Sequence, residues 1–547
     1  MFKNNRGALR WIFENSKPIM GSIVLLTVLG IIVSYVSVEF AMAARELLDV
    51  ATGVSEKSFK LCVIRIVVLL LAEVALESFY NIYAVRVSSK NKNRLQKNLF
   101  ASVIKSDFAL VGRYHSGELV NRLTGDINII NSNILGIIPA LVMLVTSVAF
   151  SFVAMMKLDF QLALICLALG PVVIVTSMLY GRKMKKLHKA CQESDGKTRS
   201  FMQECIQNIL VIKAFGSEKR TERHTELLQD INYKLNMKRG YISISMNLLY
   251  YLAMTVAYYF AVAWCAYKIS AGIMTVGTFT AIAQLVNSMQ SPFREISGTV
   301  SGFFATCASA ERVMEIENIP EDKTRDEVIS GFKNLTVQSM DFAYGDEKIF
   351  TDVDFVLEKG DISVITGYSG QGKSTFLKLL MGIYKPSKGT MKVSADEGVM
   401  DLGASTRSLF AYVPQGNMII SGTVRENIAF FSEVDEETIV NAAKCAEIYD
   451  YILTLPEGLD TVLGEGGMGL SEGQVQRIAV ARALCTTAPV ILLDEATSAL
   501  DDETEAKILE NINSLANRTS VIITHRKAAL DIATSCYCLE YGKIVKK

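Results

Sequence analysis

The chain has 547 residues, enough for more than one domain with a sizeable core. Half of the residues are hydrophobic, only 20% are charged and the mean hydropathy is +0.28, so the chain is too apolar for an ordinary soluble protein and part of it is expected to lie in a lipid bilayer. Lysine and arginine total 56, as do aspartate and glutamate, and without a basic excess we expect no nucleic-acid partner. The ten cysteines lack metal-ligand spacing and are expected to be reduced thiols.

The first half of the chain contains long apolar segments. The uncharged run from Pro18 to Val38 is too long for the apolar core of a signal peptide and long enough to cross a bilayer. A second segment is less clear because Arg65, Glu73 and Glu77 interrupt it. We expect six membrane spans in all, near residues 18–40, 60–84, 134–156, 160–181, 241–267 and 269–293.

Positive charge is unevenly distributed between these spans. The segments 86–126 and 182–239 are rich in lysine and arginine, whereas the joints at 45–60 and 157–159 carry little or no positive excess. The positive-inside rule therefore places both long segments and both termini in the cytoplasm. We expect a multi-pass protein of the plasma membrane whose helices continue well past the bilayer.

The composition changes after the last span. Residues 317–330 are charged and include Pro320, which is typical of a linker. From residue 331 onward short apolar runs alternate with helical patterns, as in an α/β nucleotide-binding domain.

The sequence GYSGQGKST at 367–375 matches the phosphate-binding pattern G-x-x-x-x-G-K-[ST]. An apolar strand precedes it and a helix follows it, which is the context that the pattern requires. Glycines let the backbone wrap a triphosphate at the start of a helix. Lys373 is then expected to reach the β- and γ-phosphates, and the Ser374 hydroxyl to bind Mg²⁺.

Two further motifs follow. In VILLDEATSALD at 490–501, an apolar strand ends in Asp494 and Glu495. Asp494 is expected to hold Mg²⁺, directly or through water, and Glu495 to accept a proton from the attacking water or to orient it. In LSEGQVQRIAVARAL at 470–484, the Ser471 hydroxyl and the Gly473 N–H form a second anion site at the start of a helix. One triphosphate cannot easily be wrapped by both sites of a single domain, which favours two domains arranged head to tail.

Together these motifs resemble the ATP-binding-cassette (ABC) exporters, and almost the whole chain is similar to a half-transporter of that family. The resemblance implies a multidomain membrane protein in which an all-α, six-helix transmembrane domain at 1–316 is followed by an α/β P-loop ATPase domain at 331–547. It also implies short helices near 107–115 and 204–213 that dock on ATP-binding domains.

The resemblance further implies roles for individual residues. Tyr344 matches the aromatic residue that stacks on adenine, Gln415 the loop glutamine that senses Mg²⁺, and His525 the histidine that holds the γ-phosphate. The catalytic residues are thus expected to be Glu495, His525 and Gln415. The ATP-binding residues of the chain itself are expected to be Tyr344, Gly367, Tyr368, Ser369, Gly370, Gln371, Gly372, Lys373, Ser374, Thr375 and Asp494. The expected Mg²⁺ ligands are Ser374, Gln415 and Asp494, and the expected contacts to the ATP of an opposite subunit are Ser471, Gly473, Gln474 and Asp501.

The chain departs from the family at one position of the second anion site. The family signature usually reads L-S-G-G-Q, and Glu472 replaces its first glycine. We expect this carboxylate to point away from the phosphate, leaving Ser471 and Gly473 usable.

We therefore expect an ATPase, with ATP and Mg²⁺ as cofactors, that exports a peptide, a lipid or a hydrophobic drug-like molecule by alternating access of a dimer. The partner is an identical or a different half-transporter. Import of a metal chelate and a nucleotide-gated regulator remain open as alternatives, whereas a soluble ATPase of DNA repair is disfavoured by the six spans. Because a charge inside a bilayer rarely faces lipid, we expect Glu73 to face a central cavity or another helix.

Overall fold

The computed structural model describes the chain except for residues 1–5, 323–328, 330, 417–418, 465–466, 468 and 516–517. Within the helices, the side chains of residues 6, 167–183, 185, 188–189, 250, 291–298 and 300–301 also lie outside the described set. The chain divides into two compact units. The first comprises Met1–Val103 and His115–Asn318, and the second Ile104–Tyr114 and Ile319–Lys547.

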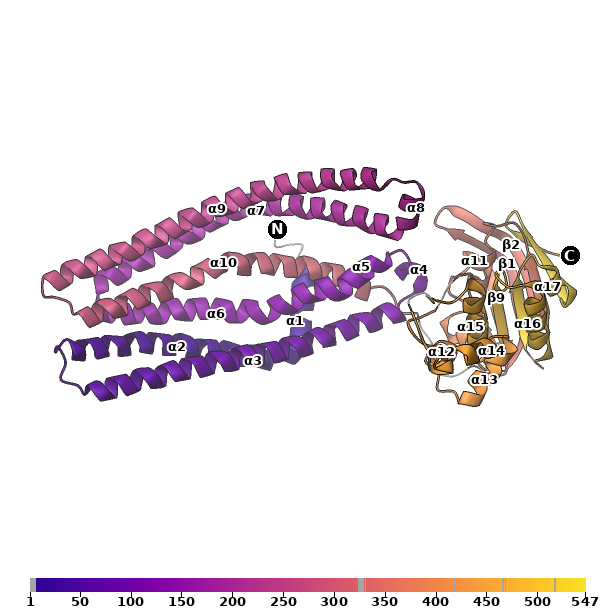
Figure 1. Ribbon diagram of the computed structural model, residues 1–547, viewed down its shortest axis with the longest axis horizontal. Helices are drawn as coiled ribbons and strands as arrows, with labels where there is room; N and C mark the ends of the chain where they lie inside the picture. Colours follow the sequence, from indigo (N-terminus) through magenta and orange to yellow (C-terminus); the bar gives the residue numbers. More distant parts are fainter. Residues whose placement is uncertain are drawn as a thin grey trace. The chain divides into compact units, whose positions relative to one another are not determined.

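The first unit is helical (Figure 1). Its long helices have between 32 and 53 residues, more than the roughly 20 that cross a bilayer. They are α2 (Met20–Ala51), α3 (Phe59–Lys105), α6 (Ile127–Leu158), α7 (Phe160–Gln207), α9 (Glu218–Ser270) and α10 (Val276–Glu317). The shorter elements are α1 (Arg6–Ser16), η1 (Lys17–Ile19), α5 (Ser116–Asn121), the π-helical turn η2 (Arg122–Asp126) and α8 (Ile209–Ala214).

Three helical stretches among the described residues are both long and apolar enough to cross a membrane. They are Gly7–Ala51, Ser116–Leu158 and Glu218–Ser270, and they contain the first, third and fifth predicted spans. The other predicted spans fall on α3, α7 and the start of α10, where charged residues interrupt α3 and many side chains of α7 and α10 are outside the described set. The total of six spans therefore stays a prediction.

The last predicted span, 269–293, includes a turn. Helix α9 ends at Ser270 and α10 begins at Val276. Gly272 has a φ of +72°, which favours glycine, and the Thr275 hydroxyl caps α10 by accepting from the backbone N–H of Thr278 at 3.1 Å. A hydropathy pattern does not contain these local signals, which set the start of the helix.

A buried ion pair joins α9 to the start of α7. Asp159 caps α7 by accepting from the N–H of Leu162 at 3.1 Å, and its other oxygen is 2.5 Å from the Lys268 ammonium. The indole of Trp264 donates to the same oxygen at 3.1 Å. The Asp159 side chain is 2% exposed, so its charge is compensated within the protein rather than by water.

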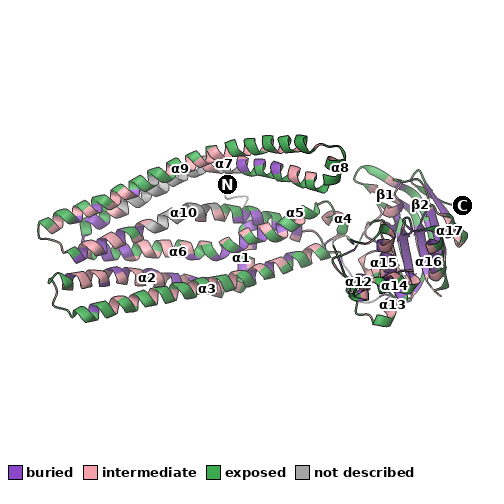
Figure 2. Cartoon of the chain, in the orientation of Figure 1, coloured by how far each residue is buried: buried purple, intermediate pink, exposed green. Residues whose placement is uncertain are grey.

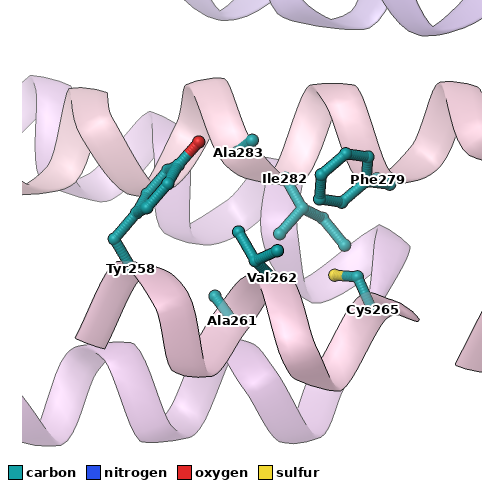
Figure 3. A pocket seen from close by; sticks show the side chains of 7 residues that line it. All are labelled: Tyr258, Ala261, Val262, Cys265, Phe279, Ile282 and Ala283. Atoms are coloured by element: carbon teal, nitrogen blue, oxygen red, sulfur yellow. The ribbon is translucent and has the colours of Figure 1, made fainter. Parts of the chain in front are cut away.

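Side chains of α9 and α10 meet in a narrow apolar crevice, shown in Figure 3. Tyr258, Val262 and Cys265 extend from α9 toward Phe279 and Ile282 of α10. The crevice is too narrow to hold a water molecule. It is therefore a packing seam between two helices and not a binding site.

The second unit contains two main sheets and the short helix α4 (Phe108–Val111). The four-stranded antiparallel sheet has the order β2-β1-β4-β5, formed by Glu347–Glu358, Phe332–Tyr344, Lys388–Ala395 and Gly398–Asp401. The six-stranded sheet has the order β12-β11-β3-β10-β9-β6, formed by Lys543–Lys546, Ser535–Glu540, Ile362–Thr366, Thr519–Ile523, Val490–Asp494 and Phe410–Val413. A small third sheet pairs β7 (Gly422–Thr423) with β8 (Val462–Leu463).

Helices connect the strands of this unit. They are α11 (Lys373–Leu380), η3 (Ala404–Leu409), α12 (Val424–Ala429), α13 (Glu436–Cys445), α14 (Tyr449–Thr454), η4 (Gly458–Asp460), α15 (Glu472–Leu484), α16 (Asp502–Ser514) and α17 (Lys527–Asp531). All five residues of β9 and all five of β10 are buried, as expected for parallel strands covered on both faces.

The register of the parallel strands positions the site. Strands β6, β9, β10, β3 and β11 run parallel, and Ile523 of β10 lies opposite Asp494 of β9. The carboxyl ends of these strands therefore meet at one edge of the sheet, where ligands bind in open α/β sheets.

Short helices occur at both places where docking helices are predicted. Helix α4 begins after Asp107, whose backbone N–H donates to the carbonyl of Pro320 at 3.0 Å, and the ring of Phe108 lies 6.2 Å from that of Tyr384. Helix α4 thus packs within the second unit. Helix α8 belongs to the helical unit, and Leu210 and the adjacent Phe215 are 79% and 80% exposed.

Candidate active site

Glycines shape the loop between β3 and α11. Gly367 and Gly372 have φ of +145° and +99°, which other residues rarely adopt. A Cβ at Gly372 would lie 2.6 Å from Cγ2 of Ile349, and one at Gly367 would lie 2.5 Å from the carbonyl oxygen of Leu539. The loop therefore requires glycine at both positions, and it delivers the chain to the N-terminus of α11, which favours an anion.

Lys373, the first residue of α11, lies inside this loop and is 6% exposed. Its ammonium donates to the carbonyls of Gly367 at 2.5 Å and Tyr368 at 3.3 Å. It also lies 3.1 Å from Nε2 of His525, which follows β10. The two side chains predicted to act on the γ-phosphate are thus brought together from positions 152 residues apart.

The remaining loop residues lie around Lys373. Tyr368, Ser369 and Gly370 are exposed, with Tyr368 at 76%, and Gln371 is half-buried. Tyr368 and Ser369 are therefore accessible to a ligand.

Asp494 is the last residue of β9 and is 1% exposed. Its Oδ1 accepts a hydrogen bond from Oγ of Ser374 at 3.0 Å, and its Oδ2 accepts one from the hydroxyl of Tyr412 at 3.0 Å. Burial raises the pKa of Asp494 above its ordinary value, the two hydroxyl donors oppose that rise, and the neighbouring charge of Glu495 adds to it. The carboxylate and the Ser374 hydroxyl offer oxygen donors side by side, a set that suits Mg²⁺.

Glu495 has a φ of +50°, an uncommon conformation for a residue with a side chain. Its backbone N–H donates to the carbonyl of Ile523 at 3.0 Å, which holds this turn against β10. Its carboxylate accepts from the Gln415 amide at 2.6 Å and lies 3.8 Å from the Lys373 ammonium. Strained backbone is frequent at functional sites, and here it aims a carboxylate at the lysine of the phosphate loop.

Tyr344 ends β1 and is 40% exposed. Its hydroxyl is 3.2 Å from Oγ1 of Thr375, and its ring meets that of Tyr384 edge to face at 5.3 Å. Tyr344 thus lies beside the phosphate loop with part of its surface accessible, as a base-stacking residue requires.

The second anion site forms the start of α15. Ser471 caps this helix reciprocally with Gln474, and Glu472 is exposed in the first turn. A Cβ at Gly473 would lie 3.0 Å from the carbonyl oxygen of Ala499. Asp501 caps α16 by accepting from the N–H of Thr504 at 2.9 Å. Within the described part of the chain, no hydrogen bond joins Ser471 to residues 367–375.

Two aromatic residues of the site were not predicted from the sequence. Tyr412 donates to Asp494, and Tyr384 packs against both Tyr344 and Phe108. Tyr412 is the tyrosine of AYVPQ, three residues before Gln415, and this closeness to a predicted site residue is the feature of the sequence that could have indicated it.

Comparison with known proteins gives the family that the sequence motifs resemble. The family model described as "ABC transporter transmembrane region" matches residues 23–293, and the one described as "ABC transporter" matches 350–498. An "ATP-dependent lipid A-core flippase" of Desulfotalea psychrophila is 30% identical over 480 residues, covering 86% of this chain and 83% of that protein. The chain belongs to the ABC transporter family. A protein of the same description from Pseudomonas aeruginosa is 30% identical over 496 residues, 88% of this chain and 81% of its own length.

A solved structure described as "a bacterial Atm1-family ABC exporter with ATP bound" shares the fold of this ABC transporter. The TM-score is 0.82 at 23% identity, covering 97% of this chain and 95% of the other. The predicted fold class is confirmed: a helical transmembrane region precedes a sheet-containing ATP-binding domain. The chain is a multi-pass membrane protein and an ATPase that couples ATP hydrolysis to transport.

Proposed function

We propose that this ABC transporter is one half of a dimeric exporter that moves a lipid-like amphiphile out of the cytoplasmic leaflet of the plasma membrane. The match to lipid A-core flippases over more than four-fifths of both chains supports a substrate of this class. The observation that carries ATP-driven turnover is the convergence of Lys373, Glu495 and His525 at one sheet edge.

In this proposal the chain's own residues bind and orient the nucleotide. Tyr344 stacks on the base, and residues 367–375 surround the phosphates. Lys373 and His525 hold the γ-phosphate, and Glu495, oriented by Gln415, accepts the proton of the attacking water. The Gln415 amide donates to Glu495 at 2.6 Å and so holds the carboxylate in place.

Ser374 and Asp494, with Gln415, are the proposed ligands of Mg²⁺. Their hydroxyl, carboxylate and amide oxygens are the hard donors that this ion prefers. Mg²⁺, when bound, neutralises charge on the transferring phosphoryl group. Asp494 is suited to this role because burial limits competition from water and its two hydroxyl partners hold its oxygens in place.

We further propose that each ATP lies between two half-transporters. Ser471 and Gly473 begin α15, whereas Lys373 begins α11, so one domain carries two separate anion-binding helix starts. The Ser471, Gly473, Gln474 and Asp501 of one subunit then complete the phosphate loop of the other. The partner is a second half-transporter, either another copy of this chain or a different one.

Exposed residues at α8 of the helical unit support such a partner (Figure 2). Leu210 and Val211 of α8, and Phe215 after it, are more than half exposed. Helix α4 packs within the second unit. An apolar helix of this kind is expected to dock in a cleft of another ATP-binding domain. Both termini and the ATP-binding domain then lie in the cytoplasm, as the positive charge of 86–126 and 182–239 predicts.

Reconstitution into vesicles tests the proposal. Full-length protein is inserted into vesicles that contain lipids labelled on the headgroup with a fluorophore, and a membrane-impermeant quencher reports the leaflet of each label. We expect ATP added on the side of the ATP-binding domains to move label to the opposite leaflet, and Glu495→Gln to prevent this movement. Movement toward the ATP side would indicate an importer. ATP hydrolysis that is stimulated by peptides or drugs, without lipid movement, would overturn the lipid-like substrate.

A further inference from the structure

Tyr412 lies on β6, beside the strand that carries the acidic residues of the site. Strands β6 and β9 pair in parallel, with Tyr412 opposite Leu492. Asp494 follows Leu492 by two residues and so shares its face of the sheet. A phenol is long enough to reach from the position of Tyr412 to the next side chain on that face, and its hydroxyl is 3.0 Å from Oδ2 of Asp494.

Both oxygens of the Asp494 carboxylate are therefore held by hydroxyl donors. Ser374 supplies the donor to Oδ1, also at 3.0 Å, and Asp494 is 1% exposed. The Tyr412 ring packs against the hydrophobic core of the sheet, so its position is fixed. An ionised carboxylate can only accept a hydrogen bond, so the Tyr412 hydroxyl is the donor to Asp494.

The same strand directs a second donor to the other carboxylate. Gln415 follows β6, and its amide donates to Glu495 at 2.6 Å. Residues 412–415 therefore hold both adjacent acids of the site, one through a phenol and one through an amide. Gln415 is a proposed Mg²⁺ ligand, whereas no functional role has yet been assigned to the contact of Tyr412 with Asp494.

We propose that Tyr412 is a positioning residue for the divalent metal ion, which fixes the rotation of the Asp494 carboxylate and thereby raises the affinity of the ATP site for Mg²⁺. The inference rests on the proposed role of Asp494 as a metal ligand. Ser374 is itself a proposed ligand, so Tyr412 is the partner of Asp494 that stays outside the metal's coordination shell. Partners of metal-binding carboxylates typically change metal affinity by about 10- to 100-fold when they are removed.

The test replaces Tyr412 with phenylalanine, which keeps the ring and removes the hydroxyl. Tyr537→Phe is the matched control, because that hydroxyl belongs to the same sheet and donates to the carbonyl of Val356 at 3.1 Å, away from the acids. The full-length protein is melted with a non-hydrolysable ATP analogue over a range of free Mg²⁺. The midpoint of the Mg²⁺-dependent rise in melting temperature reports metal affinity without turnover, and melting without analogue and Mg²⁺ reports stability.

We expect Tyr412→Phe to raise this Mg²⁺ midpoint by about tenfold, and Tyr537→Phe to leave it at the wild-type value. An unchanged midpoint in Tyr412→Phe, or equal shifts in the two variants, would overturn the inference and leave Tyr412 a structural residue. Asp494→Asn separates the two levels of the proposal. If Asp494→Asn keeps the wild-type Mg²⁺ midpoint, Asp494 is not a metal ligand and both proposals fail. If Asp494→Asn shifts the midpoint but Tyr412→Phe does not, only the role of Tyr412 is refuted.

Discussion

Gly372 and Gly370 offer a paired test of the phosphate loop, because both have positive φ but different surroundings. Their φ values are +99° and +82°. A Cβ at Gly372 would lie 2.6 Å from Ile349 and 3.2 Å from Phe350, whereas one at Gly370 would meet nothing within 4 Å. A left-handed conformation costs a residue with a side chain about 1–2 kcal/mol, and overpacking a core adds about 1–3 kcal/mol.

We therefore expect Gly370→Ala to destabilise the ATP-binding domain by about 1–2 kcal/mol and Gly372→Ala by about 2–5 kcal/mol. For a domain of this size, each kcal/mol corresponds to about 2–4 °C in melting temperature. The assay is thermal melting of the full-length protein without nucleotide, which avoids any effect of the substitutions on ATP binding. Equal shifts in the two variants, or a larger shift for Gly370→Ala, would show that the close approach of Gly372 to β2 does not constrain the loop.

Three other substitutions, one of them with a matched control, test separate parts of the molecule. Glu495→Gln should abolish steady-state ATP hydrolysis while ATP still binds and locks a closed dimer; near-normal turnover would rule out the role of general base. Lys268→Met leaves the buried Asp159 without its charged partner and should cost about 3–5 kcal/mol of stability. Lys234→Met, which breaks an exposed pair on the same helix, should cost less than about 1 kcal/mol, and equal losses in the two variants would contradict the account of the buried pair. Glu73→Gln should change the response of the ATPase to substrate at unchanged melting temperature, whereas a loss of stability alone would show that Glu73 is structural.

The sequence was most informative about residues that directly follow a buried strand. Residues 367–375, Asp494 and His525 each follow an apolar run, and parallel strands bring the ends of such runs to one edge. The motifs were therefore enough to predict that residues 367–375 and Asp494 gather at the site, whereas His525 was predicted from the resemblance to ABC exporters. The sequence did not indicate the contact between Lys373 and His525, which depends on side-chain geometry.

Features that depend on register or on distant partners could not be predicted in this way. Tyr412 reaches Asp494 only because β6 and β9 pair with a particular offset, and the sequence does not encode that offset locally. In the sequence, Arg65 interrupts the apolar segment at 60–84. In the structure it pairs with Glu39 and Glu46 of α2, each at 2.7 Å.

The central claim is that two chains share each ATP, and nucleotide counting tests it most directly. Two differently tagged copies of the chain, both carrying Glu495→Gln to prevent turnover, are combined with Lys373→Ala in one copy and Ser471→Ala in the other. Shared sites predict no trapped ATP in a dimer of either variant alone and one trapped ATP in the mixed dimer, where one site bears both lesions and the other bears neither. Two trapped ATP molecules in the Ser471→Ala dimer, or none in the mixed dimer, would contradict the claim.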